Sequence, residues 1–255
     1  MTKLVYIIGN EHGSVFTQKE ELPHLEKKVT VTSGLIKILA VNEKITNLFL
    51  EGTTEENLND GENYLAKLAD LDEKKAHDLV QETIKKNVDK DPQVLGLEIY
   101  EELAKTRRLG INIKFYPTEC IFFDDEIKLL EEFGKLFVST DKSFSEFIKD
   151  LKEITKDLSE NDRAGALYEI PTVNEFLNTT RDFYIYSNLK KYSGEKNIIY
   201  IGRAHKLKEI SRDKEFKSFR IDVADEINGS MPKKLEEEIE TYLSEKKVKS
   251  RIIYT

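Results

Sequence analysis

Two of the four histidines stand in the same short sequence frame, near opposite ends of the chain. His12 follows Gly9 by three positions and His205 follows Gly202 by three positions, and both glycines come after apolar runs. Glycine accounts for 12 of the 255 residues, so one histidine has about a one-in-twenty chance of this placement. The repetition therefore favours a shared role. An imidazole can bind a divalent metal, act as a base or, when protonated, hold an anion.

Carboxylates accompany these histidines. Glu11 precedes His12 directly, Glu51 ends the apolar run 48–50, and Glu119 follows the run 111–116. Two imidazoles and a glutamate suit zinc, manganese or a similar ion, which predicts His12, His205 and Glu51 as metal ligands. Without a metal, a carboxylate can instead orient an imidazole that acts as a general base.

A cationic candidate comes about twenty residues before the second frame. Arg181 lies in the polar step Asn-Thr-Thr-Arg-Asp, where its guanidinium can stabilise an oxyanion or hold a substrate carboxylate. A surface pair between Arg181 and its neighbouring aspartate is the other interpretation. Asn10 and Arg203, which lie within the two histidine frames, and Ser14, two residues after His12, are secondary candidates.

These residues need a scaffold that brings distant segments together. Short apolar runs rich in β-branched residues predict strands at 3–8, 45–50, 111–116, 198–201, 219–223 and 248–254. Helical spacing predicts helices at 29–41, 54–90, 95–109, 124–137, 142–158, 172–192 and from 232 to about 245. Parallel strands end at the same edge of a sheet, so this order of elements predicts that the residues after the strands form a ligand-binding edge.

The alternation of strands and helices predicts an α/β fold. We expect a central, largely parallel sheet flanked by helices, in one domain that covers residues 1–255. The helices expected around 120–170 interrupt the alternation and are interpreted as a helical insertion or cap. In this arrangement His12, Glu51, Glu119 and His205 converge on one edge of the sheet.

Composition limits the classes of partner. The net charge is −8, and lysine pairs stand beside glutamates, so nucleic acid is not an expected partner. The apolar runs are shorter than the ~18–20 residues that a membrane-spanning helix needs, so no membrane is expected either. Cys120 is the single cysteine, which excludes an intramolecular disulfide, and it is expected to be packed. We expect a cytoplasmic protein, and association of identical copies stays open.

The motifs resemble those of the superfamily of TIKI, TraB, erythromycin-esterase and ChaN proteins. That group is similar in its paired Gly-x-x-His signature, its early strand-end glutamate and its Arg-Asp or Arg-Asn step before the second signature. The segment 9–14 is similar to the His-Gly-Thr/Ser segment of the esterase branch, where a glutamate directly follows the glycine. Here Asn10 holds that place and Glu11 comes one later. Phe-Leu-Glu51-Gly resembles the TraB and TIKI branch, whereas Arg203 stands where small residues are usual.

The resemblance implies several activities. TIKI-like members are metal-dependent peptidases, esterase members hydrolyse a macrolide lactone, ChaN-like members bind haem, and TraB members are linked to pheromone regulation. The leading hypothesis is a hydrolase that cleaves an amide or ester bond of a small-molecule or peptide substrate. Its catalytic residues would be His12, His205, Glu11, Glu51 and Arg181, with or without zinc, manganese or cobalt. The alternatives are a non-catalytic protein that binds haem or a small acidic ligand, and a regulatory protein.

Overall fold

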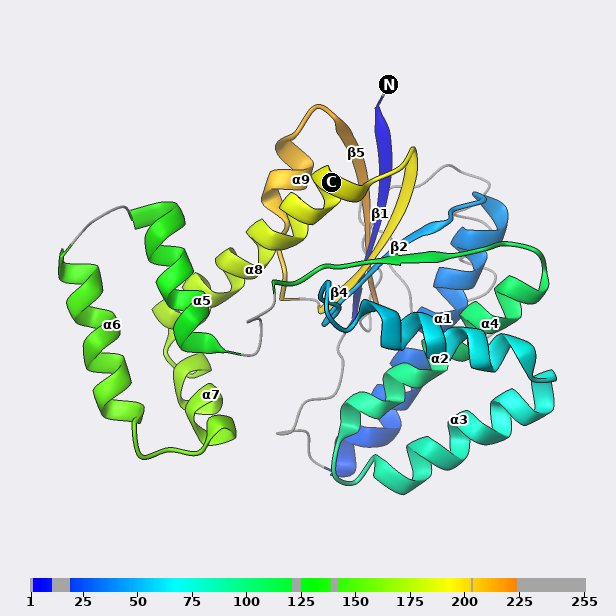
Figure 1. Cartoon of the computed structure of the whole chain (residues 1–255), viewed down its shortest axis with the longest axis horizontal. Coiled ribbons are helices and arrows are strands. Elements are labelled where there is room, and N and C mark those ends of the chain that lie inside the picture. Colours follow the sequence, from blue (N-terminus) through cyan, green and yellow to red (C-terminus); the bar gives the residue numbers. More distant parts are fainter. Residues whose placement is uncertain (1, 11–18, 121–124, 139–141, 203, 224–255) are drawn as a thin grey trace.

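The sequence forms a parallel sheet at the centre of the molecule (Figure 1). The structure is a computed structural model that describes residues 2–10, 19–120, 125–138, 142–202 and 204–223. Within them the sheet has five strands in the order β3-β2-β4-β1-β5, and every pairing is parallel. The strands are β1 (Lys3–Asn10), β2 (Asn47–Leu50), β3 (Lys114–Tyr116), β4 (Lys196–Gly202) and β5 (Phe216–Val223). The predicted α/β fold with a largely parallel sheet is therefore confirmed.

Successive side chains of the central strands enter two different apolar clusters. In β1, Tyr6 and Ile8 pack into one cluster, while Val5 and Ile7 pack into the other. All four are at most 4% exposed, so both faces of the sheet are covered. This is why the strand sequences read as continuous apolar runs rather than as alternating apolar and polar residues.

Helices make up most of the remaining described chain. The α-helices are α1 (Leu22–Asn42), α2 (Leu58–Asp70), α3 (Glu73–Asn87), α4 (Leu97–Arg108), α5 (Glu126–Phe133), α6 (Lys142–Thr155), α7 (Glu160–Tyr168), α8 (Pro171–Tyr192) and α9 (Lys208–Arg212). Shorter turns of helix are η1 (Lys19–Glu21), η2 (Pro92–Gly96) and the π-helical η3 (Gly134–Val138). No helix among the described residues is both long enough and apolar enough to span a membrane.

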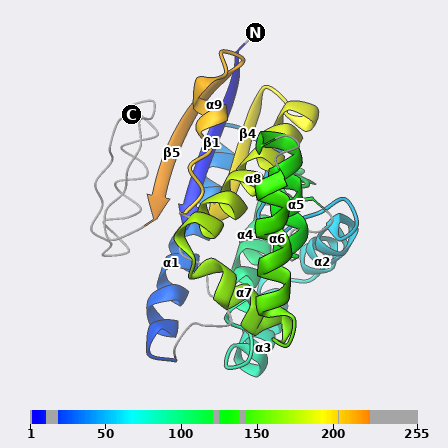
Figure 2. The same cartoon turned by 90° about the vertical axis from the view of Figure 1, so that its left-hand side faces the viewer.

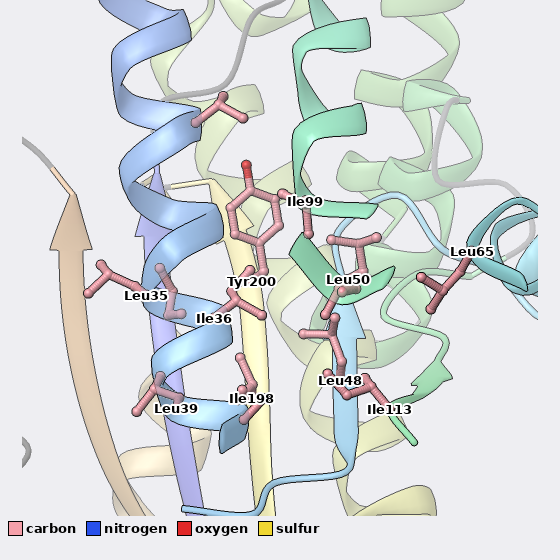
Figure 3. Packing of buried hydrophobic residues seen from close by; sticks show 14 of the residues in the cluster. Leu35, Ile36, Leu39, Leu48, Leu50, Leu65, Ile99, Ile113, Ile198 and Tyr200 are labelled. Atoms are coloured by element: carbon pink, nitrogen blue, oxygen red, sulfur yellow. The ribbon is translucent and has the colours of Figure 1, made fainter. Parts of the chain in front are cut away.

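The two faces of the sheet are covered by different helices. Helices α1 to α4 cover the face that carries Tyr6 and Ile8. Figure 3 shows Leu35, Ile36 and Leu39 of α1 and Ile99 of α4 against Leu48, Leu50, Ile198 and Tyr200 of the strands. Helices α8 and α9 cover the opposite face, with Ile185 and Ile210 in the second cluster. The sheet therefore has a helical layer on each side.

A third apolar cluster lies away from the sheet. It is formed by α5, α6, α7 and the first half of α8, which we call the helical lobe (Figures 1 and 2). Leu130, Leu151, Leu167 and Leu177 are buried there together. Cys120 is half-buried against this cluster. The lobe occupies the part of the sequence where the helical insertion was expected.

Several predicted boundaries were wrong. The stretch 54–90 is two helices, because the Asp72 side chain accepts the Lys75 N–H and starts α3 after a break. Helix α1 begins at Leu22, seven residues earlier than expected, with Pro23 in its first turn. Helix α7 was not predicted, although Ser159 caps its first turn. The predicted helix at 232–245 and strand at 248–254 lie outside the described residues.

Candidate functional site

The order of the strands marks one position of the sheet as a site. β1 is followed by α1 on one face, whereas its neighbour β4 is followed by α9 on the opposite face. Neighbouring strands whose connections leave toward opposite faces define a topological switch point, where open α/β sheets bind their ligands. Asn10 and Gly202 end these two strands and lie opposite each other in register. The glycines of both histidine frames therefore belong to this edge.

Glu51 is placed at the edge by a tight turn after β2. The N–H of Thr53 donates to the carbonyl of Leu50 at 3.1 Å, and Gly52 between them has a φ of +77°. Only glycine adopts this backbone conformation without strain, which explains the Glu-Gly pair. The Glu51 N–H donates to the carbonyl of Tyr200 at 2.9 Å, and the Glu51 carboxylate accepts the N–H of Gly202. Glu51 is thus fixed against β4.

Glu119 reaches the same place because the segment after β3 is bonded to that turn. The N–H groups of Thr118 and Glu119 both donate to the carbonyl of Thr53 at 2.9 Å. The Thr118 hydroxyl also donates to the Leu50 carbonyl at 2.8 Å. The side chain of Glu119 is fully buried as a result.

Arg181 of α8 lies between these two carboxylates. Its Nη2 donates to Oε1 of Glu119 at 2.7 Å and to Oε1 of Glu51 at 3.2 Å, and its Nε donates to Oε2 of Glu119 at 3.4 Å. Burial acts to lower the pKa of Arg181, but Glu119 and Glu51 outweigh it and raise that pKa. The interpretation as a surface pair with the next aspartate is therefore wrong, and Arg181 is a buried counter-ion for two glutamates.

The imidazole of His205 lies between the carboxylates of Asp182 and Glu51. Its Nδ1 lies 2.6 Å from Oδ1 of Asp182, and its Nε2 lies 3.4 Å from Oε1 of Glu51. The other oxygen of Asp182 accepts the N–H groups of Lys206 and Leu207, each at 3.0 Å. One aspartate therefore holds both the imidazole and the loop that carries it.

Strand β5 also holds the loop after β4, which carries His205. Arg220 donates through Nη1 to the carbonyl of His205 and through Nε to Oδ1 of Asp222 at 2.8 Å. A Cβ atom at Gly9 would lie 2.2 Å from that Asp222 oxygen. The first glycine of the paired frames is thus needed to leave room for the Arg220–Asp222 pair.

The surroundings of His205 favour a proton or a metal ion on its Nε2 atom. If Nδ1 donates its proton to Asp182, neutral His205 points the Nε2 lone pair at a carboxylate oxygen of Glu51. Two lone pairs at that separation repel each other unless a proton or a metal ion lies between them. Burial lowers the pKa of His205, but the bonds to Asp182 and Glu51 outweigh it and raise that pKa to about 9. Metal-free His205 is therefore an imidazolium at neutral pH.

This shift predicts how stability depends on pH. A group whose folded pKa is raised from 6.5 to about 9 stabilises the fold fully below pH 6.5 and loses that contribution as the pH rises through 9. Metal-free protein should lose about 3 kcal/mol of unfolding free energy across this window relative to His205→Gln. Urea unfolding at pH 6 and pH 9.5 measures the difference. His77→Gln is the control, because His77 contacts the carboxylate of Glu101 and is half exposed. Equal pH dependence in all three proteins would contradict the charged state of His205.

The structure brings together part of the predicted site. Glu51, Glu119, Arg181 and His205 form one connected network at the edge, and Asn10 lies beside it. Glu11, His12, Ser14 and Arg203 lie outside the described residues, so their placement stays a prediction.

Asp182 was overlooked as a site residue, although a signal was present. It precedes Ile185 by three positions and Leu189 by seven, so it falls on the buried stripe of α8. A carboxylate on an apolar stripe needs a buried partner, and His205 is that partner. Tyr168 of α7 was also missed; burial raises the pKa of its hydroxyl and the positive charge of Arg181 opposes that rise, so the electrostatic network extends to the helical lobe.

The described residues fit part of a metal site. An imidazole that binds metal through Nε2 usually donates its other N–H to a carboxylate, as His205 does to Asp182. Glu51 offers an oxygen beside Nε2 as a second ligand. No group of three His, Cys, Asp or Glu ligands occurs among the described residues, and His12, the third predicted ligand, falls outside them.

Comparisons with known proteins do not identify a family. No protein-family model and no curated protein matches the chain. Among solved structures, the type III effector HopBA1 is similar over 78% of this chain, with 16% sequence identity and a TM-score of 0.30. The match covers 66% of the HopBA1 chain, so this chain spans about two thirds of that protein.

Proposed function

We propose that this chain hydrolyses an amide or ester bond at the carboxyl edge of its sheet, with Glu51 and His205 as the central groups. One observation supports the proposal most strongly: a histidine that is 2% exposed lies between the carboxylates of Asp182 and Glu51. This arrangement supplies a base and an acid side by side at the switch point of the sheet. The resemblance of the motifs to the TIKI and erythromycin-esterase group agrees with the same class of reaction.

The proton transfers follow from the positions of these two groups. Glu51 accepts a proton from a water molecule whose oxygen bonds to the substrate carbonyl carbon, and the carbonyl π electrons move to oxygen. When the tetrahedral species collapses, the bond to the leaving nitrogen or oxygen breaks, and that atom takes the proton from Nε2 of His205. The proton on Glu51 then passes to Nε2 over their 3.4 Å separation and restores both groups.

Arg181 has a positioning role in this proposal as well as the predicted role in oxyanion stabilisation. Its Nε and Nη2 already serve Glu119 and Glu51, so its first effect is to hold Glu51 ionised and in place. An ionised Glu51 is the form that accepts a proton. The predicted contact with an oxyanion would fall to Nη1.

A divalent metal held by Nε2 of His205, Glu51 and the predicted third ligand His12 would supply Lewis-acid activation of the carbonyl group. In that form Asp182 keeps its role, because it accepts the Nδ1 proton and presents Nε2 as the ligand atom.

The geometry favours this proposal over the two binding alternatives. Nδ1 of His205 is held by Asp182 and Nε2 faces Glu51 at 3.4 Å, so an ion at Nε2 would share its position with a carboxylate, which suits a non-haem metal better than a haem iron. Within the described network three carboxylates, Glu51, Glu119 and Asp182, face one guanidinium and one imidazole. That balance favours a cation or a neutral substrate over a small acidic ligand.

An activity screen combined with metal analysis tests the proposal. The chain, purified without an affinity tag, is assayed against p-nitrophenyl acetate and a fluorogenic peptide library, before and after dialysis against zinc, manganese or cobalt. We expect turnover that His205→Ala lacks, and elemental analysis reports whether one metal ion per chain accompanies it. Turnover no greater than that of His205→Ala on every substrate would reject the hydrolase and favour a regulatory protein.

A further inference from the structure

A surface groove runs along the helical lobe between α5 and α6, which lie side by side (Figures 1 and 2). It consists of two cavities of about 660 and 450 Å³, and both are lined by Glu131 and Lys152. These two residues form an ion pair at 2.5 Å, so the cavities meet at this pair. On α6 the lining residues extend from Phe144 to Thr155, which is about 16 Å at the rise of an α-helix.

The groove is basic, although the whole chain has a net charge of −8. Among the described residues that line it, two are acidic and six are cationic: Lys128, Lys135, Lys149, Lys152, Lys156 and Arg163. Helix α6 separates its charges, because Lys149 and Lys152 line the groove, whereas Glu146, Asp150 and Glu153 line neither cavity. The positive charge is therefore concentrated on one side of this helix.

These cations are accessible to a ligand. All five lysines of the groove are exposed. The ion pairs of Lys152 with Glu131 and of Lys128 with Asp125, the latter at 3.1 Å, are surface pairs that contribute little to stability. Lys149 forms no ion pair with another described residue. An anionic ligand would therefore gain favourable contacts without disrupting ion pairs on which the fold depends.

Apolar side chains line each of the two cavities. Phe144 and Ile148 line the larger one, and Ile127 lines the smaller one. A Cβ atom at Gly134 would lie 2.7 Å from a ring carbon of Phe144, so the glycine lets this half-buried ring lie against the end of α5. The pair of Glu131 and Lys152 is shared by both cavities, which disfavours a long hydrocarbon chain because it would cover two charges.

We propose that this groove binds an acidic amphipathic helix of a partner protein. Three turns of helix match its length, and apolar side chains one or two turns apart would contact the two apolar regions. Acidic side chains flanking that apolar stripe would then face the lysines. The carboxylates and apolar side chains of the groove favour such a helix over a nucleic acid, whose phosphates need a continuous positive surface. The inference goes beyond the proposed hydrolase and does not depend on it.

Fluorescence anisotropy with designed peptides tests the proposal. The probe is a fluorescein-labelled helical peptide of about fourteen residues, with leucines at helical spacing and glutamates at most other positions. One comparison peptide has the same composition in scrambled order, and another has lysine in place of each glutamate. We expect the full chain to bind the probe at least about tenfold more tightly than either comparison peptide. The affinity should fall as sodium chloride is raised from about 50 to about 500 mM.

A matched pair of variants places the binding in the groove. Lys149→Glu combined with Lys156→Glu should weaken binding of the probe by about tenfold or more, because like charges then face each other. Lys85→Glu combined with Lys86→Glu is the control. These two lysines are exposed on α3, outside the helical lobe, and the control changes the net charge of the chain by the same amount. Its affinity for the probe should stay within about twofold of that of the unmodified chain.

Three results would overturn the proposal. Equal weakening in both double variants would assign the binding to the overall charge of the chain. Equal affinity for the ordered and scrambled peptides would show that the groove does not recognise an amphipathic helix. An oligouridylate of the same charge that binds more tightly, and is lost in Lys149→Glu with Lys156→Glu, would assign the groove to a nucleic acid. None of these measurements involves turnover, so the hydrolase is tested separately.

Discussion

Arg181→Met should destabilise the fold by about 3–5 kcal/mol, because it leaves Glu119 buried without its counter-ion and removes one of the two cations that face Glu51. The carboxylate of Glu119 is fully buried and that of Glu51 is nearly so, which prevents water from replacing the guanidinium. Urea unfolding followed by far-ultraviolet circular dichroism measures the loss, since the chain has no tryptophan.

Two further variants make this result specific. Adding Glu119→Gln to Arg181→Met should recover most of the lost stability, because it removes the buried charge that lost its counter-ion. Arg212→Met is the control: Arg212 lies exposed on α9 and should change stability by less than about 0.5 kcal/mol. Equal losses for Arg181→Met and Arg212→Met would mean that Arg181 is not the counter-ion described above.

Asp182→Asn should lower kcat by about 10²–10⁴-fold while the chain remains folded. The side-chain oxygen of an asparagine can still accept the N–H groups of Lys206 and Leu207, so its NH₂ group would face Nδ1 of His205. The imidazole would then take the tautomer with its proton on Nε2. In that tautomer Nδ1 carries the lone pair and the ring is neutral. Nε2 is then a weaker acid, and the ion pair between His205 and Glu51 is lost.

The tautomer provides a readout that a general structural defect would not change. Nitrogen-15 NMR of the His205 ring should show that Nδ1 has lost its proton in Asp182→Asn, while Nε2 keeps the proton that it carries in the imidazolium. Asp213→Asn is a matched control, because Asp213 also accepts a backbone N–H and side-chain bonds, from Glu215, Tyr186 and Lys190. Full activity in Asp182→Asn, or an unchanged ring spectrum, would remove Asp182 from the mechanism.

The part of the site that could be predicted depends on strand direction alone. Glu51, Glu119 and His205 follow three different strands, and parallel strands end at one edge, so their convergence follows from the alternation of strands and helices. The order of the strands is different, because β4 enters between β2 and β1 only through contacts distant in sequence. No local pattern carries that information.

The pairing of charges could not be predicted for a related reason. Whether Arg181 faces Glu119 or solvent depends on the rotation of α8 about its axis, which the packing of Ile185 and Leu189 decides. The spacing of Asp182 from those two residues did indicate that Asp182 lies on the buried side of α8. Helix boundaries within 54–90 were missed because a capping aspartate, rather than a glycine or proline, separates α2 from α3.

Three successive residues of α8 bond to three different parts of the molecule. The Thr180 hydroxyl lies 3.4 Å from the Leu129 carbonyl of α5, Arg181 binds the turns after β2 and β3, and Asp182 binds the loop after β4. A rotation of this helix by a few tens of degrees would disturb all three sets of bonds at once. Any molecule that seats on the helical lobe and twists α8 would therefore alter the acid–base pair from a distance, without occupying the reaction centre.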